Sequence, residues 1–179
     1  MNPAGQTIRS LIDQHAELSP HQPFVVYPET GIRHTWSEFQ ARVQSMAQHL
    51  SNMEFPPNVP VAGLLGNGQA ALELFLGGMY GGFQILLANP LSGADILAHV
   101  LEHSESTTLF VDPQHKEIAK QAISQLADKP QLIPLRAENG PDSKSIVPYE
   151  KLSTPKPCPE DAALLIYTSG TTGRPKGVI

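Results

Sequence analysis

Cysteine and clustered basic residues are scarce in this sequence, and each scarcity excludes a class of protein. Cys158 is the single cysteine in 179 residues, so a disulfide framework cannot form. It stands between two prolines with no evident base beside it, which favours an inert thiol over a catalytic nucleophile. The formal net charge is −5 and Lys and Arg form no run, which argues against nucleic acid as a partner.

The N-terminus has neither the charged nor the apolar region of a secretory signal. An uncharged stretch, Leu74 to Ala94, is long enough to cross a bilayer. Its glycines, Gln84 and the Asn89-Pro90 pair interrupt it, so we expect a helix, a turn and a strand in a buried core. With the single cysteine, this pattern predicts a cytoplasmic protein without a transmembrane segment.

Short apolar runs alternate with amphipathic segments, and 40% hydrophobic content supports one domain with a core. The clearest helix starts at Thr35, which forms a capping box with Glu38. Its apolar stripe at helical spacing is Trp36, Phe39, Val43, Met46 and Leu50. Other helices are expected at 7–17, 69–80, after Ser92 and from 113, and strands at 24–27, 61–65, 83–87, 107–111 and 131–135. This alternation predicts an α/β fold, a mostly parallel sheet with flanking helices.

Three of these helix starts have candidate capping residues. Asn67 precedes the helix at 69, Ser92 and Asp95 stand at the next, and Asp112 precedes Pro113. We therefore expect side-chain caps at all three positions.

The last eighteen residues combine a strand with a loop suited to phosphate. Residues 162–167 form an unbroken apolar run without helical period, which predicts a strand buried on both faces. The loop that follows is rich in glycine and hydroxyl groups and carries Lys176. Glycines allow close backbone approach, hydroxyls donate hydrogen bonds and the cation neutralises charge, so the predicted ligand is a polyphosphate. Neither the Walker pattern nor G-x-G-x-x-G fits these residues.

The stretch from Tyr167 to Val178 resembles, residue for residue, the signature loop of the adenylate-forming (AMP-binding) enzymes. These include acyl-CoA synthetases, adenylation domains of nonribosomal peptide synthetases, and luciferases. Residues 35–39 and 81–91 resemble, less specifically, two earlier family segments. The resemblance implies that residues 1–179 are the N-terminal portion of an AMP-binding domain, part of the large N-terminal domain of such an enzyme.

The resemblance also implies an activity, ATP-dependent carboxylate activation through an acyl-adenylate. Its cofactors would be ATP and Mg²⁺, with coenzyme A or phosphopantetheine as thiol acceptor, and its substrate a carboxylic acid. The residues expected to bind the β- and γ-phosphates are Thr168, Ser169, Gly170, Thr171, Thr172, Gly173 and Lys176. Arg174 falls at a variable position and receives no role.

Several later family motifs are missing here: the magnesium-linked glutamate, the ribose-binding aspartate, the hinge, and the small domain with its catalytic lysine. We therefore expect no catalytic or metal-binding residue within these 179 residues. We also expect an inactive fragment that associates with the remaining polypeptide or with itself, since a cut through a large domain exposes apolar surface.

The sequence leaves three functions open, two of them enzymatic and one non-catalytic. Asn89-Pro90-Leu91 favours a coenzyme A ligase, with fatty acid metabolism one expected setting. The alternatives are an adenylation domain loading a carrier protein, and a non-catalytic nucleotide-binding or interaction module.

One motif points elsewhere. His99 to His103 matches H-x-x-E-H, an inverted zinc-peptidase pattern with both histidines on one helical face. Because the pattern is short and lacks a third ligand, a solvated helix face is the favoured interpretation.

Overall fold

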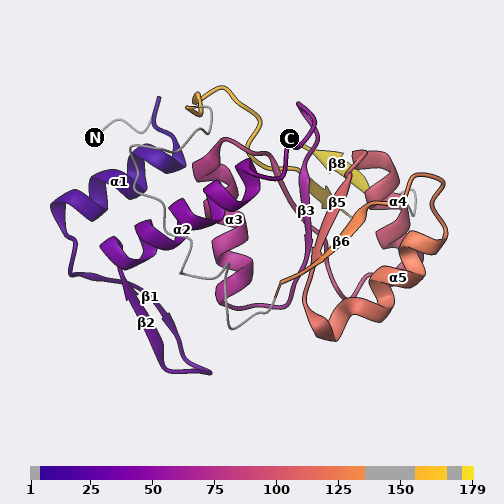
Figure 1. The fold of residues 1–179 in the computed structure, drawn as a ribbon, viewed down its shortest axis with the longest axis horizontal. Coiled ribbons are helices and arrows are strands. Elements are labelled where there is room, and N and C mark those ends of the chain that lie inside the picture. Colours follow the sequence, from indigo (N-terminus) through magenta and orange to yellow (C-terminus); the bar gives the residue numbers. More distant parts are fainter. Residues whose placement is uncertain (1–4, 136–155, 169–174) are drawn as a thin grey trace.

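A computed structural model describes residues 5–135, 156–168 and 175–179 (Figure 1). In chain order the helices are α1 (Ile8–Leu18), α2 (Trp36–Ser51), α3 (Gln69–Gly81), α4 (Ala94–Ser104) and α5 (Lys116–Ser124), the last preceded by the 3-10 turn η1 (Pro113–His115). The strands are β1 (Pro23–Tyr27), β2 (Ile32–Thr35), β3 (Val61–Leu64), β4 (Ile85–Leu87), β5 (Thr108–Val111), β6 (Gln131–Pro134), β7 (Ile166–Thr168) and β8 (Lys176–Val178).

A four-stranded parallel sheet in the order β4-β3-β5-β6 forms the centre of the described structure. Ala62 of β3 pairs with Leu86 on one side and with Leu109 on the other. Parallel neighbours need crossover connections, which α3, α4 and α5 provide in turn. The α/β fold with a parallel sheet and flanking helices is therefore confirmed.

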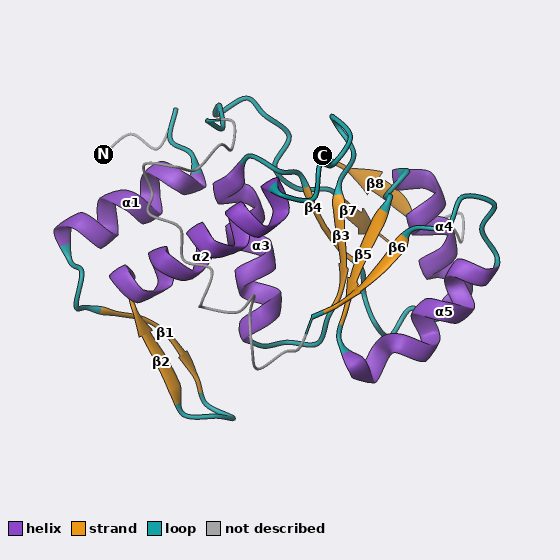
Figure 2. Ribbon diagram, in the orientation of Figure 1, coloured by secondary structure: helices purple, strands orange, loops and turns teal. Residues whose placement is uncertain are grey.

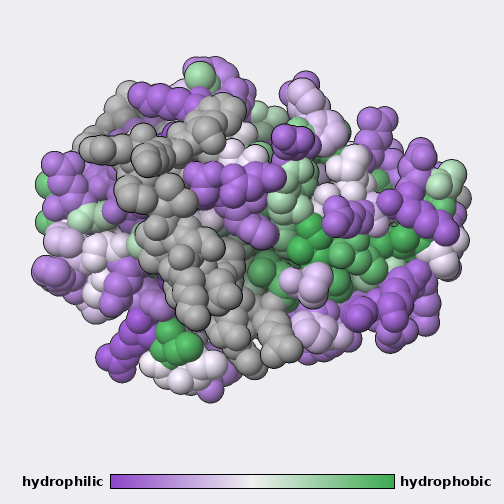
Figure 3. Space-filling view, viewed as in Figure 1, coloured by the Kyte–Doolittle hydropathy of each residue, from purple (hydrophilic) through white to green (hydrophobic). Residues whose placement is uncertain are grey.

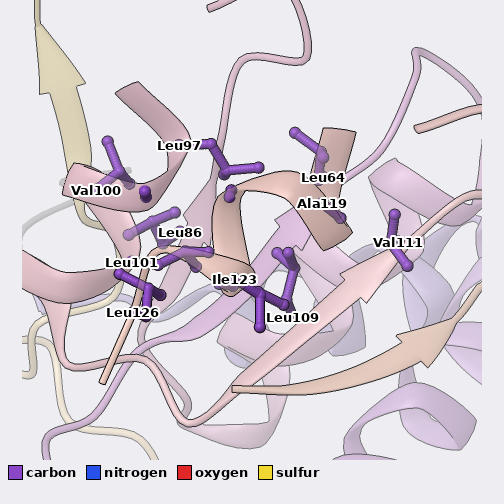
Figure 4. Close-up of a cluster of buried hydrophobic side chains, with 13 residues drawn as sticks. Leu64, Leu86, Leu97, Val100, Leu101, Leu109, Val111, Ala119, Ile123 and Leu126 are labelled. Carbon is purple, nitrogen blue, oxygen red and sulfur yellow. The ribbon is translucent and has the colours of Figure 1, made fainter. Parts of the chain in front are cut away.

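Both faces of this sheet are covered, which produces three layers (Figure 2). Alternate residues of each strand point to opposite faces. Ala62, Leu64 and Leu109 pack with α4 and α5 in a cluster of buried side chains (Figure 4). Val61 and Phe110 contribute to the cluster that includes residues of α2 and α3 on the other face. This two-sided burial explains why β3 and β5 are continuous apolar runs.

Helices α1, α2 and α3 pack together beyond the sheet. The expected capping box is present, since the Thr35 N–H donates to Glu38 Oε2 at 2.8 Å and its hydroxyl accepts from the Glu38 N–H. Four residues of the predicted α2 stripe, Phe39, Val43, Met46 and Leu50, are fully covered, whereas Trp36 at the start of the helix is partly buried. Polar contacts join the layer as well, because Arg42 forms an ion pair with the buried Glu73.

The other predicted caps divide into one confirmed and two wrong. Asp112 Oδ1 accepts from the His115 N–H at 3.2 Å, as expected of a cap, while its Oδ2 accepts from the Gly66 N–H at 2.7 Å. The N-caps of α3 and α4 are instead Gly68 and Gly93, neither with a side-chain cap. The Ser92 hydroxyl donates to the Asn89 carbonyl within a turn, and α4 begins after Gly93.

The strand β2 was not expected. It pairs antiparallel with β1 across the predicted turn, with Tyr27 opposite Ile32. The hairpin lies on the outside of the helical layer (Figure 1). Its sequence, Ile32-Arg33-His34-Thr35, has one apolar residue and is mostly exposed, so it carries no period-two signal.

The strand predicted at 162–167 is shorter and less buried than expected. Ala162 and Ala163 are exposed, regular pairing begins at Ile166, and that side chain is 49% exposed. The expectation of burial on both faces is therefore wrong. Leu165 and Tyr167 reach the cluster beneath α4, while Leu164 packs on the opposite cluster. The run lies at the β4 edge, where the described residues cover it only partly.

The uncharged stretch divides as expected. Helix α3 ends in the left-handed Gly82 with φ 83°, and β4 follows. Across the described ranges, no helix is both long enough and apolar enough to cross a membrane.

Figure 3 shows hydrophobic residues gathered on one face over β6 and the adjoining part of α5. Pro134 ends this edge strand and offers no N–H to a further strand.

Close packing of α3 predicts an unusual response to alanine at Gly78. A Cβ there would lie 2.7 Å from Ile85 Cγ1 and closer still to Cδ1. Glycine to alanine in a helix ordinarily stabilises by about 1 kcal/mol. Here we expect Gly78→Ala to lower the free energy of unfolding by about 1–3 kcal/mol, because overpacking dominates. Chemical denaturation measures this change.

Ile85→Val supplies the control, since it removes Cδ1 alone. The double variant Gly78→Ala/Ile85→Val should recover part of the loss. An additive, further loss in the double variant would contradict the steric explanation.

Candidate functional site

The loop expected to bind phosphate closes an antiparallel hairpin. Ile166, Tyr167 and Thr168 pair with Val178, Gly177 and Lys176 respectively. Thr168 and Lys176, the first and last of the predicted site residues, are therefore direct partners, about 5 Å apart by strand geometry. Both are exposed.

The middle of the predicted site lies outside the described residues. This part comprises Ser169, Gly170, Thr171, Thr172 and Gly173, together with Arg174. The structure therefore locates the two ends of the loop, and the phosphate contacts of all seven predicted residues stay a prediction.

Two sets of contacts attach the hairpin to the body of the protein. At the sheet edge, the Ile85 N–H donates to the Ala163 carbonyl at 3.0 Å, and the Leu165 N–H donates to the Ile85 carbonyl at 2.9 Å. This parallel bridge places the entry to β7 beside β4. The chain that enters β7 therefore runs parallel to β4 at that edge of the sheet.

The second set comes from α4. His103 Nδ1 lies 2.7 Å from the Tyr167 hydroxyl, and the two rings meet edge-on with centroids 5.6 Å apart. One turn earlier, His99 Nε2 lies 3.2 Å from the Pro175 carbonyl oxygen. Because a carbonyl only accepts, this nitrogen of His99 carries the hydrogen.

Gly177 on the neighbouring strand faces Leu165 and the Tyr167 ring. A Cβ at Gly177 would lie 3.1 Å from Leu165 Cδ1, a tight contact, and 3.4 Å from Tyr167 Cζ, an ordinary van der Waals contact, so Leu165 is the side chain that the glycine accommodates. Partial burial raises the pKa of the Tyr167 phenol above its ordinary value of 10.0. The phenol is therefore protonated at neutral pH and can take part in the contact with His103.

A cavity of about 200 Å³ lies beneath the hairpin. It is bounded by the end of β4, the first turns of α4 and the hairpin, with Asn89, Ser92, Tyr167 and Pro175 in its wall. Asn89 holds its own turn, since its Oδ1 accepts from the Leu91 N–H at 2.9 Å. The Asn89-Pro90-Leu91 segment therefore lies at the carboxyl end of β4, beside the candidate site.

Both histidines of the H-x-x-E-H motif contact the hairpin. The two histidines share one helical face, as expected, and each directs a ring nitrogen to the hairpin. Among the described residues, no group of three or more His, Cys, Asp or Glu is arranged to hold a metal ion. Sequence reasoning missed the contact with the hairpin because it joins residues distant in sequence.

The remaining candidate nucleophile lies away from this site. Cys158 is exposed, and its backbone N–H donates to Asp161 Oδ2 at 2.6 Å. It belongs to the turn that delivers the chain to the sheet edge.

The parallel α/β sheet with a hairpin at its edge is the architecture of the N-terminal domains of adenylate-forming enzymes. The family described as AMP-binding enzyme matches residues 12–179. The chain therefore belongs to the AMP-binding enzyme family.

Curated relatives include ligases and peptide synthetases. The chain is 28% identical to a sulfoacetate–CoA ligase of Cupriavidus necator over 179 residues, covering 97% of this chain and 34% of the relative. It is 28% identical to a 3-methylmercaptopropionyl-CoA ligase of Ruegeria lacuscaerulensis, covering 96% and 34%. Apicidin F synthase of Gibberella fujikuroi is 26% identical and is covered over 3% of its length. The chain spans about a third of the length of these two CoA ligases.

Solved structures agree in fold. The inhibitor-bound N-terminal domain of FACL13 from Mycobacterium tuberculosis matches with a TM-score of 0.75 and 27% identity, covering 97% of this chain and 44% of that one. A luciferase-like enzyme from Zophobas morio matches with a TM-score of 0.82 at 16% identity, covering 99% and 43%. The second similarity concerns the fold alone.

The raised pKa of Tyr167 predicts how its hydroxyl contributes to stability. We expect Tyr167→Phe to lower the free energy of unfolding by about 1 kcal/mol at neutral pH, through loss of one hydrogen bond. The folded pKa exceeds the unfolded one, so the neutral phenol's contribution is complete below pH 10.0 and is lost as the pH rises through the folded value. The gap between wild type and variant should therefore narrow in alkaline solution, as measured by denaturation.

Tyr27 supplies the contrast. Burial, with the Glu73 carboxylate adding to it, raises its pKa to about 12, yet its hydroxyl has no hydrogen-bond partner among the described residues. Tyr27→Phe should cost little at neutral pH and should reduce the loss of stability between pH 10.0 and about 12. A gap for Tyr167→Phe that stays constant across this range would contradict the prediction.

Proposed function

We propose that the chain contributes the polyphosphate-binding hairpin to an ATP-dependent carboxylate-activating ligase. The observation that carries this proposal is the direct pairing of Thr168 with Lys176, which closes the signature loop within a chain of the AMP-binding family. In the first half-reaction, a carboxylate oxygen attacks the α-phosphorus of ATP and the bond to the β-phosphate oxygen breaks. The products are an acyl-adenylate and pyrophosphate.

The physical difficulty of this step is charge. An anion approaches a polyphosphate, so positioning and fixed donors account for most of the catalysis. We propose that Thr168, Lys176 and the five residues 169–173 bind the β- and γ-phosphates, and that Lys176 compensates charge on the departing pyrophosphate. Magnesium would accompany ATP, and we assign it no ligand among these residues.

The second half-reaction transfers the acyl group to a thiol. The sulfur attacks the acyl carbonyl carbon and AMP leaves. We propose coenzyme A as the acceptor, supported by the Asn89-Pro90-Leu91 segment beside the hairpin and by the two CoA ligases among the relatives. The acid stays open, since these two relatives act on sulfoacetate and on 3-methylmercaptopropionate by name; fatty acids are one class to test.

Two alternatives have specific support or a clear test. Similarity to Apicidin F synthase favours an adenylation domain that loads a carrier protein. A non-catalytic nucleotide-binding module would bind ATP without releasing pyrophosphate. Incubation with ATP, a panel of acids, coenzyme A and a carrier protein separates the three functions by their product. A ligase forms the coenzyme A thioester, an adenylation domain forms the acylated carrier protein, and a non-catalytic module forms neither.

We further propose that residues 1–179 act as the N-terminal portion of a larger AMP-binding domain in the cytoplasm. Three charged hydrogen bonds from the loop would contribute about 1.5–3 kcal/mol each, and association costs about 4–15 kcal/mol. The hairpin by itself should thus bind ATP at millimolar affinity or weaker. Further polypeptide, or a second copy of the chain, would supply the remaining contacts, and light scattering reveals self-association.

Lys176 provides the direct test. In the complete gene product that contains this chain, we expect Lys176→Gln to lower kcat/KM for ATP by roughly 10- to 150-fold, as loss of one charge-assisted hydrogen bond costs about 1.5–3 kcal/mol. Carboxylate-dependent ATP–pyrophosphate exchange measures it.

Lys129, an exposed lysine in the connection after α5, is the matched control. Lys129→Gln should leave the exchange rate unchanged. Equal losses in the two variants would remove the assigned role of Lys176.

A further inference from the structure

We propose that His99 and His103 of α4 are positioning residues that hold the two ends of the phosphate-binding loop. This inference rests on the proposed function of the hairpin. His103 contacts Tyr167, the residue before Thr168, and His99 contacts Pro175, the residue before Lys176. Each end of the loop is therefore held within one residue of its first or last proposed phosphate contact.

The spacing of the helix matches the spacing of the hairpin. Residues four apart on a helix are separated by about 6 Å along its axis, and paired strands lie about 4.8 Å apart. The rings of His99 and His103 are 5.8 Å apart between centroids. One face of α4 can therefore reach both strands at once, the first through His103 and the second through His99.

The hairpin needs such support. Its strands have three residues each and are mostly exposed, and an isolated two-stranded ribbon is marginally stable in water. The pairing of Ile85 with Ala163 and Leu165 fixes only the entry to β7. In the described part of the chain, the histidine contacts are the side-chain hydrogen bonds that reach the loop ends themselves.

Helix α4 can hold the loop ends in place because its inner face is packed into the core. Leu97, Val100 and Leu101 of its inner face are at most 5% exposed and pack with β3 and β4 (Figure 4). His99 and His103 lie on the face that meets the hairpin. The two histidine contacts therefore connect the loop ends, through α4, to the core of the sheet. Displacements of about 1 Å in a reacting group can cost about 100-fold in rate, so this hold would affect ATP use.

Amide hydrogen exchange of the chain tests directly whether the two histidines stabilise the hairpin. We expect His99→Phe and His103→Phe each to speed exchange of the hydrogen-bonded backbone amides of the β7–β8 pairing about fivefold, the effect of one typical hydrogen bond. His99→Gln and His103→Asn keep a polar group near Nε2 and Nδ1 respectively, so they should restore protection. Adding Tyr167→Phe to His103→Phe should change little more, because the contact is already lost.

His21→Phe is the matched control, because His21 is exposed in the connection between α1 and β1, a segment drawn at the opposite end of the molecule from α4 in Figure 1. It should leave hairpin exchange unchanged. Unaltered exchange in both α4 phenylalanine variants, or equal acceleration in the control, would overturn the proposal.

Kinetics of the complete gene product give the second measurement. The phenylalanine variants should raise the KM for ATP about fivefold, with the carboxylate KM unchanged. A loss of active protein without a change in the KM for ATP would indicate a merely structural role and contradict the proposal. If wild type shows no carboxylate-dependent exchange, the proposed function fails, while hydrogen exchange still decides whether the histidines hold the hairpin.

Discussion

The backbone pairing of Ile85 with Ala163 and Leu165 is the contact on which the candidate site depends. It joins two segments distant in sequence and places the entry to β7 at the β4 edge of the sheet. Because the sheet is parallel and covered on both faces, this edge is a firm attachment. Without it, the entry to β7 would lose its backbone attachment to the sheet, and the hairpin would keep only its side-chain contacts.

A second set of contacts fixes the two ends of the proposed phosphate-binding loop. Thr168 and Lys176 are paired strand residues, and α4 contacts the chain at Tyr167 and Pro175. The cluster under α4 connects these contacts to the central sheet.

Local chemistry predicted much of the fold, and long-range packing determined what it missed. The Thr35–Glu38 capping box and the α2 stripe were predictable because both arise within one helix. Strand β2 and the partial exposure of residues 162–167 depend on neighbours that sequence periodicity does not contain. Likewise, Thr168 and Lys176 could be proposed from the loop motif, whereas the approach of His99 and His103 required the tertiary structure.

We propose that the hairpin of β7 and β8 is where this chain meets polyphosphate. A nuclear magnetic resonance titration of the isotopically labelled chain with magnesium ATP, and with tripolyphosphate, into the millimolar range tests this most directly. We expect the amide shifts to concentrate on Thr168, on Lys176 and on the face of α4 that contacts the hairpin. Shifts confined to other elements would contradict the proposal.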